Sequence, residues 1–165
     1  MNAELRAAAT AVLDACRARK LKIATAESCT GGLVAGALTE IAGASDVFER
    51  GFVTYSNAAK AAMLGVPVAT LDRHGAVSAQ TARAMAEGAL ARSQADLAVA
   101  VTGIAGPGGG SKQKPVGLVY FAAARRRGGL VEVSRRYGNI GRSAVRQRSV
   151  AQALVLLLQL ATARE

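Results

Sequence analysis

Residues 97–103, LAVAVTG, and the glycine-rich residues 104–110, IAGPGGG, decide the fold of this chain. The segment Leu97–Thr102 is a continuous apolar run, which is typical of a strand buried on both faces of a sheet. Directly after it, Gly103–Lys114 holds five glycines and one proline. Ligands of open α/β sheets bind beyond the carboxyl ends of the strands, so this loop predicts a site, although its composition also fits an exposed connection.

Helical and extended patterns alternate on both sides of this strand. Helical spacing or a helix-start signal predicts helices over residues 2–19, 33–41, 57–64, 78–93 and 142–161. Short β-compatible runs occupy residues 22–26 and 51–55, and an antiparallel strand pair is predicted over residues 116–124 and 130–137. Ser78 is a suitable N-cap for the fourth helix. This alternation predicts an α/β sandwich with a mixed sheet.

The composition indicates one globular domain spanning residues 1–165. Of the 165 residues, 51% are hydrophobic and 19% are charged, which excludes an intrinsically disordered chain. The longest aliphatic block, Leu154–Leu158, is far shorter than the roughly 18 residues that a membrane span needs. The first ten residues, MNAELRAAAT, lack the basic region of a signal peptide. We therefore expect a cytoplasmic protein with no membrane partner.

Cysteine and histidine usage argues against a metal site. Cys16 and Cys29 stand in no CxxC or Cys/His cluster, and His74 is the one histidine of the chain. Zinc sites need about four such ligands at close spacing. We therefore expect neither a metal nor another cofactor, and full activity in the presence of a chelator.

The positive charge is concentrated near the C-terminus. Residues 1–120 carry 12 basic and 9 acidic side chains, whereas residues 121–165 carry nine arginines and two glutamates within a total net charge of +10. Such a segment suits nucleic acid. Single-strand readers interleave basic and aromatic residues, however, and this chain has three tyrosines, three phenylalanines and no tryptophan. A solvated arginine-rich face or a subunit contact is the favoured interpretation, with nucleic-acid binding as the alternative.

Residues 26–32, AESCTGG, are expected to end a strand and open a helix. Glycines permit close backbone approach there, and the free amides of a helix start face a ligand. The turn fits a phosphate cradle, although the spacing of a Walker loop is absent. It equally fits a nucleophile, Ser28 or Cys29, beside an oxyanion site. As a third alternative, Ser28 and Thr30 are simply helix caps.

A serine nucleophile needs a base, and the chain offers two candidates. His74 lies in a polar loop, LDRHGAVS, without a marked acidic partner. Lys60 follows Tyr55-Ser56-Asn57 on a predicted helix and is flanked by alanines that let its stem lie near the core. A lysine base must be neutral, so burial or a nearby cation must lower its pKa. The alternative is that Lys60 is an ordinary solvent-facing helix lysine.

Four blocks together resemble a known family. They are AESCTGG (residues 26–32), GFVTYSNAAKAAMLGV (51–66), GAVS (75–78) and VAVTGIAGPGGGSKQKPVGLVYFA (99–122). In this order they are similar to the C-terminal domain of the competence-damage-inducible protein CinA, whose stand-alone copies are nicotinamide-nucleotide amidases. The resemblance extends from about residue 5 to residue 160. It implies a three-layer α/β/α sandwich with a mixed, mostly parallel sheet.

The same resemblance implies an activity and a set of site residues. The family hydrolyses the carboxamide of nicotinamide mononucleotide, giving nicotinate mononucleotide and ammonia. Ser28 would be the nucleophile and Lys60 its base, with Tyr55 in the same catalytic group. Substrate-binding positions would be Thr30, Gly31, Gly32, Asn57, Thr102, Gly103, Ile104, Ala105, Gly106 and Lys114. We expect a pyridine mononucleotide substrate and a homo-oligomer, with a dimer favoured; a catalytically silent family member that binds a nucleotide or a partner is the alternative.

The chain departs from the family pattern at two positions. A GDR element usually precedes the last helix, and here Ile140 replaces its first glycine and Gly141 its aspartate, ahead of Arg142. An acidic residue usually follows GAVS, and here Ala79 stands there. The first change puts the usual pairing of that arginine in doubt. Neither change touches Ser28 or Lys60.

The last helix offers a contact for the substrate phosphate. Arg142 and Arg146 are four residues apart, so they share one face near its start, where free amides also attract anions. We predict that one or both hold the phosphate, within one subunit or across a dimer interface, whereas Arg125–Arg127 are solvated. Alternatively, the backbone amides of Ser28–Gly32 or Gly103–Gly110 bind it.

Overall fold

The structure is a computed structural model that describes residues 1–164, so Glu165, the last residue of the predicted domain, lies outside the described residues. Its helices are α1 (Ala3–Arg19), α2 (Leu33–Thr39), the 3₁₀ helix η1 (Ala44–Asp46), α3 (Asn57–Leu64), α4 (Val68–His74), α5 (Ala79–Ala91) and α6 (Arg142–Thr162). The strands are β1 (Ile23–Glu27), β2 (Phe48–Val53), β3 (Leu97–Gly103), β4 (Leu118–Arg125) and β5 (Leu130–Arg136).

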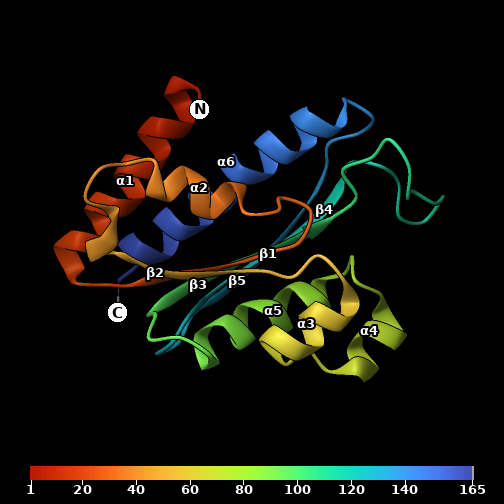
Figure 1. Cartoon of the computed structure of the whole chain (residues 1–165), viewed down its shortest axis with the longest axis horizontal. Helices are drawn as coiled ribbons and strands as arrows, with labels where there is room; N and C mark the ends of the chain where they lie inside the picture. Colours follow the sequence, from red (N-terminus) through yellow and green to blue (C-terminus); the bar gives the residue numbers. More distant parts are fainter. Residues whose placement is uncertain (165) are drawn as a thin grey trace.

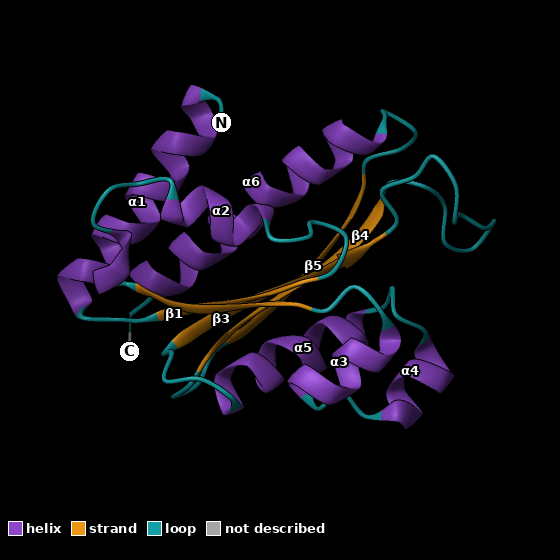
Figure 2. Cartoon of the chain, viewed as in Figure 1, coloured by secondary structure: helices purple, strands orange, loops and turns teal. Residues whose placement is uncertain are grey.

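The five strands form one mixed sheet in the order β2-β1-β3-β4-β5. Strands β2, β1 and β3 are parallel, β4 runs against β3, and β5 runs against β4. All strands except β4 therefore point in the same direction. Helices α1, α2 and α6 cover one face, and α3, α4 and α5 cover the other (Figures 1 and 2). The predicted three-layer α/β/α sandwich with a mixed, mostly parallel sheet is confirmed.

The two faces of the sheet bury side chains of different size. Toward α1, α2 and α6 the central strands present large residues, namely Ile23, Leu97, Val99, Val101, Val119 and Phe121. Toward α5 they present alanines, namely Ala24, Ala26, Ala98, Ala100, Ala122 and Ala124. Side chains alternate between the two faces along a strand, and helices cover both faces of this sheet. The large residues and the alanines of β3 are therefore both buried, which explains its continuous apolar run. The alanine face provides room for α5 to lie close to the sheet.

Two elements differ from the sequence predictions. Helix α4 was not predicted, because Gly65 and Pro67 are typical of the end of a helix. In the structure Pro67 is the N-cap of α4, where a missing N–H costs nothing. Strand β2 begins at Phe48, three residues before the predicted start. It is an edge strand that pairs with β1 and carries Glu49 and Arg50, and such charged residues obscure an apolar pattern.

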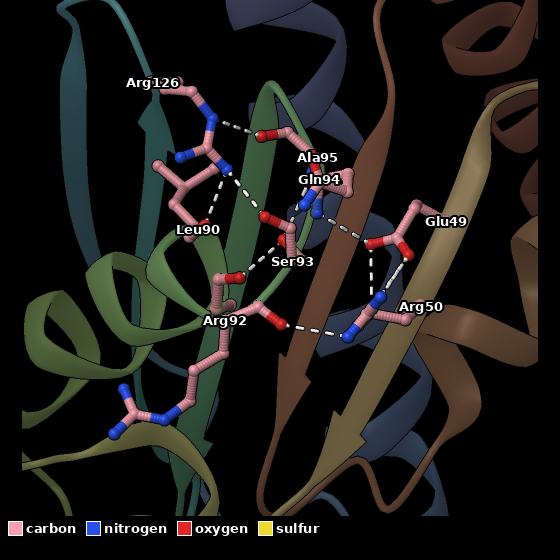
Figure 3. Close-up of polar contacts among 9 residues, drawn as sticks. Glu49, Arg50, Leu90, Arg92, Ser93, Gln94, Ala95 and Arg126 are labelled. Atoms are coloured by element: carbon pink, nitrogen blue, oxygen red, sulfur yellow. Dashed lines mark hydrogen bonds and ion pairs between the residues drawn. The ribbon is translucent and has the colours of Figure 1, made fainter.

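Part of the basic C-terminal segment stabilises the fold. The guanidinium of Arg126 donates hydrogen bonds to the carbonyl oxygens of Leu90, Ser93 and Ala95, at the end of α5 and just beyond it (Figure 3). Cations at a helix C-terminus also interact favourably with the helix dipole. The prediction that Arg125–Arg127 are merely solvated is therefore wrong for Arg126. It is also wrong for Arg125, which donates to the carbonyl of Leu160 near the end of α6.

The same end of the sheet is held by an edge-strand carboxylate. Glu49 accepts hydrogen bonds from the backbone amide of Gln94 and from the side chain of Arg50 (Figure 3). Arg50 in turn donates to the carbonyl of Arg92. These contacts join β2 to the connection between α5 and β3, at the amino ends of the parallel strands. Among residues 1–164, no helix is both long and apolar enough to cross a membrane.

Candidate active site

The candidate nucleophile lies where the parallel strands end. Glu27, the last residue of β1, pairs with Val53 of β2 and Val101 of β3, so the residues that follow all three strands meet at one edge. Ser28 comes next on the chain, and its amide donates to the carbonyl of Val101. This is the carboxyl edge of the sheet, where the sequence predicted a ligand site.

Lys60 lies directly against Ser28. Its Nζ is 2.9 Å from Ser28 Oγ and donates a second hydrogen bond, also 2.9 Å long, to the carbonyl of Thr54. Helix α3 positions the lysine: Ser56 caps the start of α3 by accepting from the amide of Ala59. Lys60 is 1% exposed and Ser28 is 8% exposed. The interpretation of Lys60 as a solvent-facing lysine is therefore wrong.

Burial gives the amine the properties of a base. Desolvation lowers the pKa of Lys60 below the ordinary lysine value, against a weaker opposing effect of the Cys29 thiol. No ion pair among residues 1–164 involves Lys60. Without a carboxylate to hold its proton, a buried amine favours the neutral form, whose lone pair can accept the proton of the Ser28 hydroxyl.

The neighbouring thiol is poorly suited to act as the nucleophile. Cys29 is buried, and this burial raises the pKa of its thiol to about 11. The thiolate is the reactive form of cysteine, so this side chain stays protonated at neutral pH. Between the two nucleophiles that the sequence left open, the geometry favours Ser28.

A cavity of about 270 Å³ opens over Ser28 and Lys60. Its lining includes nine of the fifteen predicted site residues: besides Ser28 and Lys60, these are Tyr55, Thr102, Gly103, Ile104, Ala105, Gly106 and Arg142. It also includes Gly108 and Gly109, which belong to the predicted glycine-rich loop, and Ala76 and Val77, which were not predicted as site residues. The hydroxyl of Thr102 donates to the carbonyl of Ala76 at 2.7 Å and so fixes the added wall. The GAVS block was the signal that could have identified Ala76 and Val77.

The other predicted positions lie outside the lining of this cavity. Thr30, Gly31 and Gly32 form the turn between Ser28 and α2, and Asn57 is the exposed first residue of α3. Lys114 donates to the carbonyl of His74 at 2.6 Å and thereby ties the glycine-rich loop to the end of α4. His74 does not line the cavity either, which removes it as the base for Ser28.

The two arginines of α6 make different contacts. Arg142 donates to the hydroxyl of Tyr55 at 2.8 Å and to the carbonyl of Gly106 at 2.9 Å, so it bridges two walls of the cavity. Tyr55 is 61% exposed. Arg146 lies one turn further along α6 and donates to the carbonyls of Cys29 and Thr30.

A buried carboxylate that the sequence did not reveal supports the nucleophile turn. Glu27 is 1% exposed, and its two carboxylate oxygens accept from the amides of Val34 and Ala35 at 2.8 and 3.0 Å. It therefore satisfies the start of α2, whose N-cap Gly32 has no side chain to do so. Its distance of seven residues from Val34 does not match the local spacing of a capping box, which is why the pattern was not recognised.

Residues 1–164 contain no group of three or more His, Cys, Asp or Glu side chains that could hold a metal ion. The site is thus built from a serine, a buried lysine, a tyrosine–arginine bridge and a glycine-rich loop. Such a set suits acyl transfer with the serine as nucleophile.

Known proteins are similar to this protein over nearly the whole chain. The CinA C-terminal domain family matches residues 5–161. The nicotinamide-nucleotide amidohydrolase PncC of Escherichia coli strain K12 is 52% identical over 159 residues, which cover 96% of this chain and 95% of that protein. A CinA-like protein of Akkermansia muciniphila is 64% identical over 108 residues, which cover 66% of this chain and 26% of that protein, so the chain aligns with about a quarter of such longer relatives.

A solved structure has the same fold. The crystal structure of the competence/damage inducible protein CihA from Agrobacterium tumefaciens matches with a TM-score of 0.96 and 54% identity, over 97% of each chain. This protein is therefore similar to known proteins in both sequence and fold over nearly the whole chain. On these grounds the chain belongs to the CinA C-terminal domain family.

Proposed function

We propose that this protein is an amidase that hydrolyses the carboxamide of nicotinamide mononucleotide to nicotinate mononucleotide and ammonia. The observation that carries the proposal is the 2.9 Å approach of a buried lysine amine to the Ser28 hydroxyl. The substrate is taken from the Escherichia coli relative, which is named for this amidohydrolase reaction and aligns with 96% of the chain.

In the acylation step, Ser28 attacks the carboxamide. Neutral Lys60 accepts the hydroxyl proton while Ser28 Oγ forms a bond to the carboxamide carbon, giving a tetrahedral oxyanion. The Lys60 ammonium then returns this proton to the amide nitrogen. The C–N bond breaks, ammonia leaves, and an ester between the nicotinoyl carbonyl and Ser28 Oγ remains.

Water completes the cycle in the deacylation step. Lys60, neutral again, takes a proton from a water molecule as its oxygen attacks the ester carbon. The second tetrahedral intermediate collapses, Ser28 Oγ leaves with the proton from Lys60, and nicotinate mononucleotide is released. In both steps the backbone amides of Cys29 and Thr30, which follow the nucleophile directly, are the proposed donors to the oxyanion.

The proposal predicts how the rate depends on pH. Only neutral Lys60 can accept the serine proton, so turnover rises with pH as this amine loses its proton. Because burial lowers the pKa of Lys60, the midpoint should lie below the ordinary lysine value. A profile of kcat/KM against pH measures this midpoint. A rate that rises only near the ordinary lysine pKa would contradict the role of a desolvated base.

The substrate phosphate is assigned to Arg142 and the start of α6. Arg142 lines the cavity, and the first amides of α6 have no side-chain cap. We expect Arg142→Gln to reduce the preference for nicotinamide mononucleotide over its riboside by about tenfold or more. The measurement is kcat/KM for both substrates in wild type and variant. An unchanged preference would show that Arg142 does not bind the phosphate, and would favour the backbone amides of Ser28–Gly32 or Gly103–Gly110 as its binding site.

The proposal includes four further points about the protein as a whole. It acts as a single domain over residues 1–165, in the cytoplasm, and as a homodimer. It needs no metal, so ammonia release in EDTA should equal that without it. Restoration of a lost activity by added zinc would overturn this last point.

The decisive test of the activity is a coupled assay of the purified protein with nicotinamide mononucleotide in EDTA. Ammonia and nicotinate mononucleotide should form in equal amounts. If neither forms, while the protein still binds the nucleotide in a titration, the chain is the catalytically silent family member instead.

A further inference from the structure

Arg146 holds the peptide groups that directly follow the nucleophile. Its Nε donates to the carbonyl of Cys29 at 3.1 Å, and one terminal nitrogen donates to the carbonyl of Thr30 at 3.3 Å. The side chain lies half-buried between α6 and the turn, and no ion pair among residues 1–164 involves it. Its guanidinium is therefore committed to the main chain of the turn.

The contact with the Cys29 carbonyl determines which way the Thr30 amide points. In a trans peptide the N–H points opposite to the carbonyl of the same peptide group. Because the Cys29 carbonyl faces Arg146, the Thr30 N–H faces away from that side chain. The Ser28 amide donates to the carbonyl of Val101, and the Gly31 amide donates to the carbonyl of Ser28. The amides of Cys29 and Thr30 have no acceptor in another residue within residues 1–164.

The turn is shaped to accommodate the guanidinium. Gly31 has a φ of +57°, and a Cβ added there would lie 3.3 Å from a terminal nitrogen of Arg146. Glycine at this position thus allows both the left-handed backbone and the close approach. On the other side of the turn, Glu27 anchors the start of α2. Arg146 therefore holds the carbonyls of Cys29 and Thr30, while Glu27 holds the amides of Val34 and Ala35 in the helix that follows.

A charged donor on the carbonyl side also changes the amide side. Hydrogen bonds in a chain polarise one another, so a guanidinium on a carbonyl makes the N–H of the same peptide a stronger donor. A group that pre-orients and polarises such amides stabilises negative charge that develops beside the nucleophile. Arg146 does not line the cavity, which fits an indirect role better than contact with a substrate phosphate.

We propose that Arg146 is a positioning residue: it orients and polarises the Cys29–Thr30 peptide group so that the Thr30 amide donates to the oxyanion that forms beside Ser28. The inference rests on the proposed acyl-enzyme function. It predicts that loss of Arg146 slows the chemical step on every substrate, whereas a phosphate contact would weaken binding of phosphorylated substrates alone.

The first test compares Arg146→Gln with Arg148→Gln on nicotinamide mononucleotide and on its riboside. Arg148 is exposed on the same helix, so its variant removes the same charge without touching the turn. We expect Arg146→Gln to lower kcat about 10²-fold on both substrates with little change in KM, and Arg148→Gln to match wild type. A raised KM for the mononucleotide, with kcat and the riboside rate unchanged, would overturn the proposal.

The second test separates this inference from the choice of substrate. A fluorophosphonate probe labels an activated serine and needs the same oxyanion amides, so its rate of reaction with Ser28 is followed by intact-protein mass. Labelling should be slower in Arg146→Gln and normal in Arg148→Gln. Equal labelling of all three proteins would refute the positioning role even if nicotinamide mononucleotide is not the substrate.

A third measurement guards against misfolding. In Arg146→Ala, added guanidinium chloride at millimolar concentration should partly restore labelling, because a free guanidinium can occupy the vacated position between the two carbonyls. The thermal unfolding midpoint of each variant is recorded in parallel. Faster labelling of Arg146→Ala in the presence of guanidinium supports the positioning role. The role would be contradicted if Arg146→Ala is folded but guanidinium does not raise its labelling rate, and if Arg146→Lys is labelled equally slowly.

Discussion

Lys60→Arg is expected to abolish turnover although it keeps a long basic side chain at this position. A guanidinium stays protonated throughout the physiological range and cannot accept the Ser28 proton. Loss of a general base costs about 10²–10⁴-fold in rate, which is the effect expected here on ammonia release. An active Lys60→Arg variant would show that Lys60 acts as a fixed cation rather than as a base.

Lys60→Met is the matched control for folding. Burial lowers the pKa of Lys60 in the folded protein. Between this lowered pKa and the ordinary lysine pKa, the unfolded chain therefore binds a proton that the folded protein has lost. The free energy of unfolding of the wild type should consequently rise with pH in that range. Lys60→Met should be inactive, remain folded and lack this contribution. Denaturant unfolding at several pH values measures the difference.

Ser28→Ala should lose most of the turnover. Removing a serine nucleophile usually costs several orders of magnitude, so we expect a fall of roughly 10³-fold or more in kcat. Ammonia release measures this directly, and Cys29→Ala is the neighbouring comparison, because the buried thiol with its pKa of about 11 is not expected to react. Ser28→Ala retaining about a tenth of the rate, with Cys29→Ala inactive, would assign the nucleophile to the thiol.

The central strand and the nucleophile turn could be predicted from local sequence. Leu97–Val101 is apolar throughout because both faces of β3 are covered, and this signal needs no tertiary information. The turn was recognisable because it lies between a strand and a helix and contains paired glycines. Lys60 could be named as a candidate base from the sequence, because alanines flank it on α3. Its burial could not be predicted in this way, because it depends on contacts with other parts of the fold.

Other features depended on contacts between distant segments. Glu27 caps a helix that begins six residues later in the sequence. Arg126, in the connection between β4 and β5, caps the end of α5. Neither contact follows a local spacing rule. Arg142 and Arg146 were both predicted as candidates to bind the substrate phosphate, because they lie on the same face of one helix. In the structure they contact different partners, since the glycine-rich loop lies beside the first and the nucleophile turn beside the second.

The account depends most on a covalent intermediate at Ser28, which mass spectrometry can detect. The purified protein is mixed with nicotinamide mononucleotide, quenched in acid during turnover and digested. We predict release of ammonia and a nicotinoyl-nucleotide ester on the peptide that carries Ser28, absent from Ser28→Ala. Turnover with the acyl group on Cys29 instead, or no ammonia release from this substrate at all, would contradict the account.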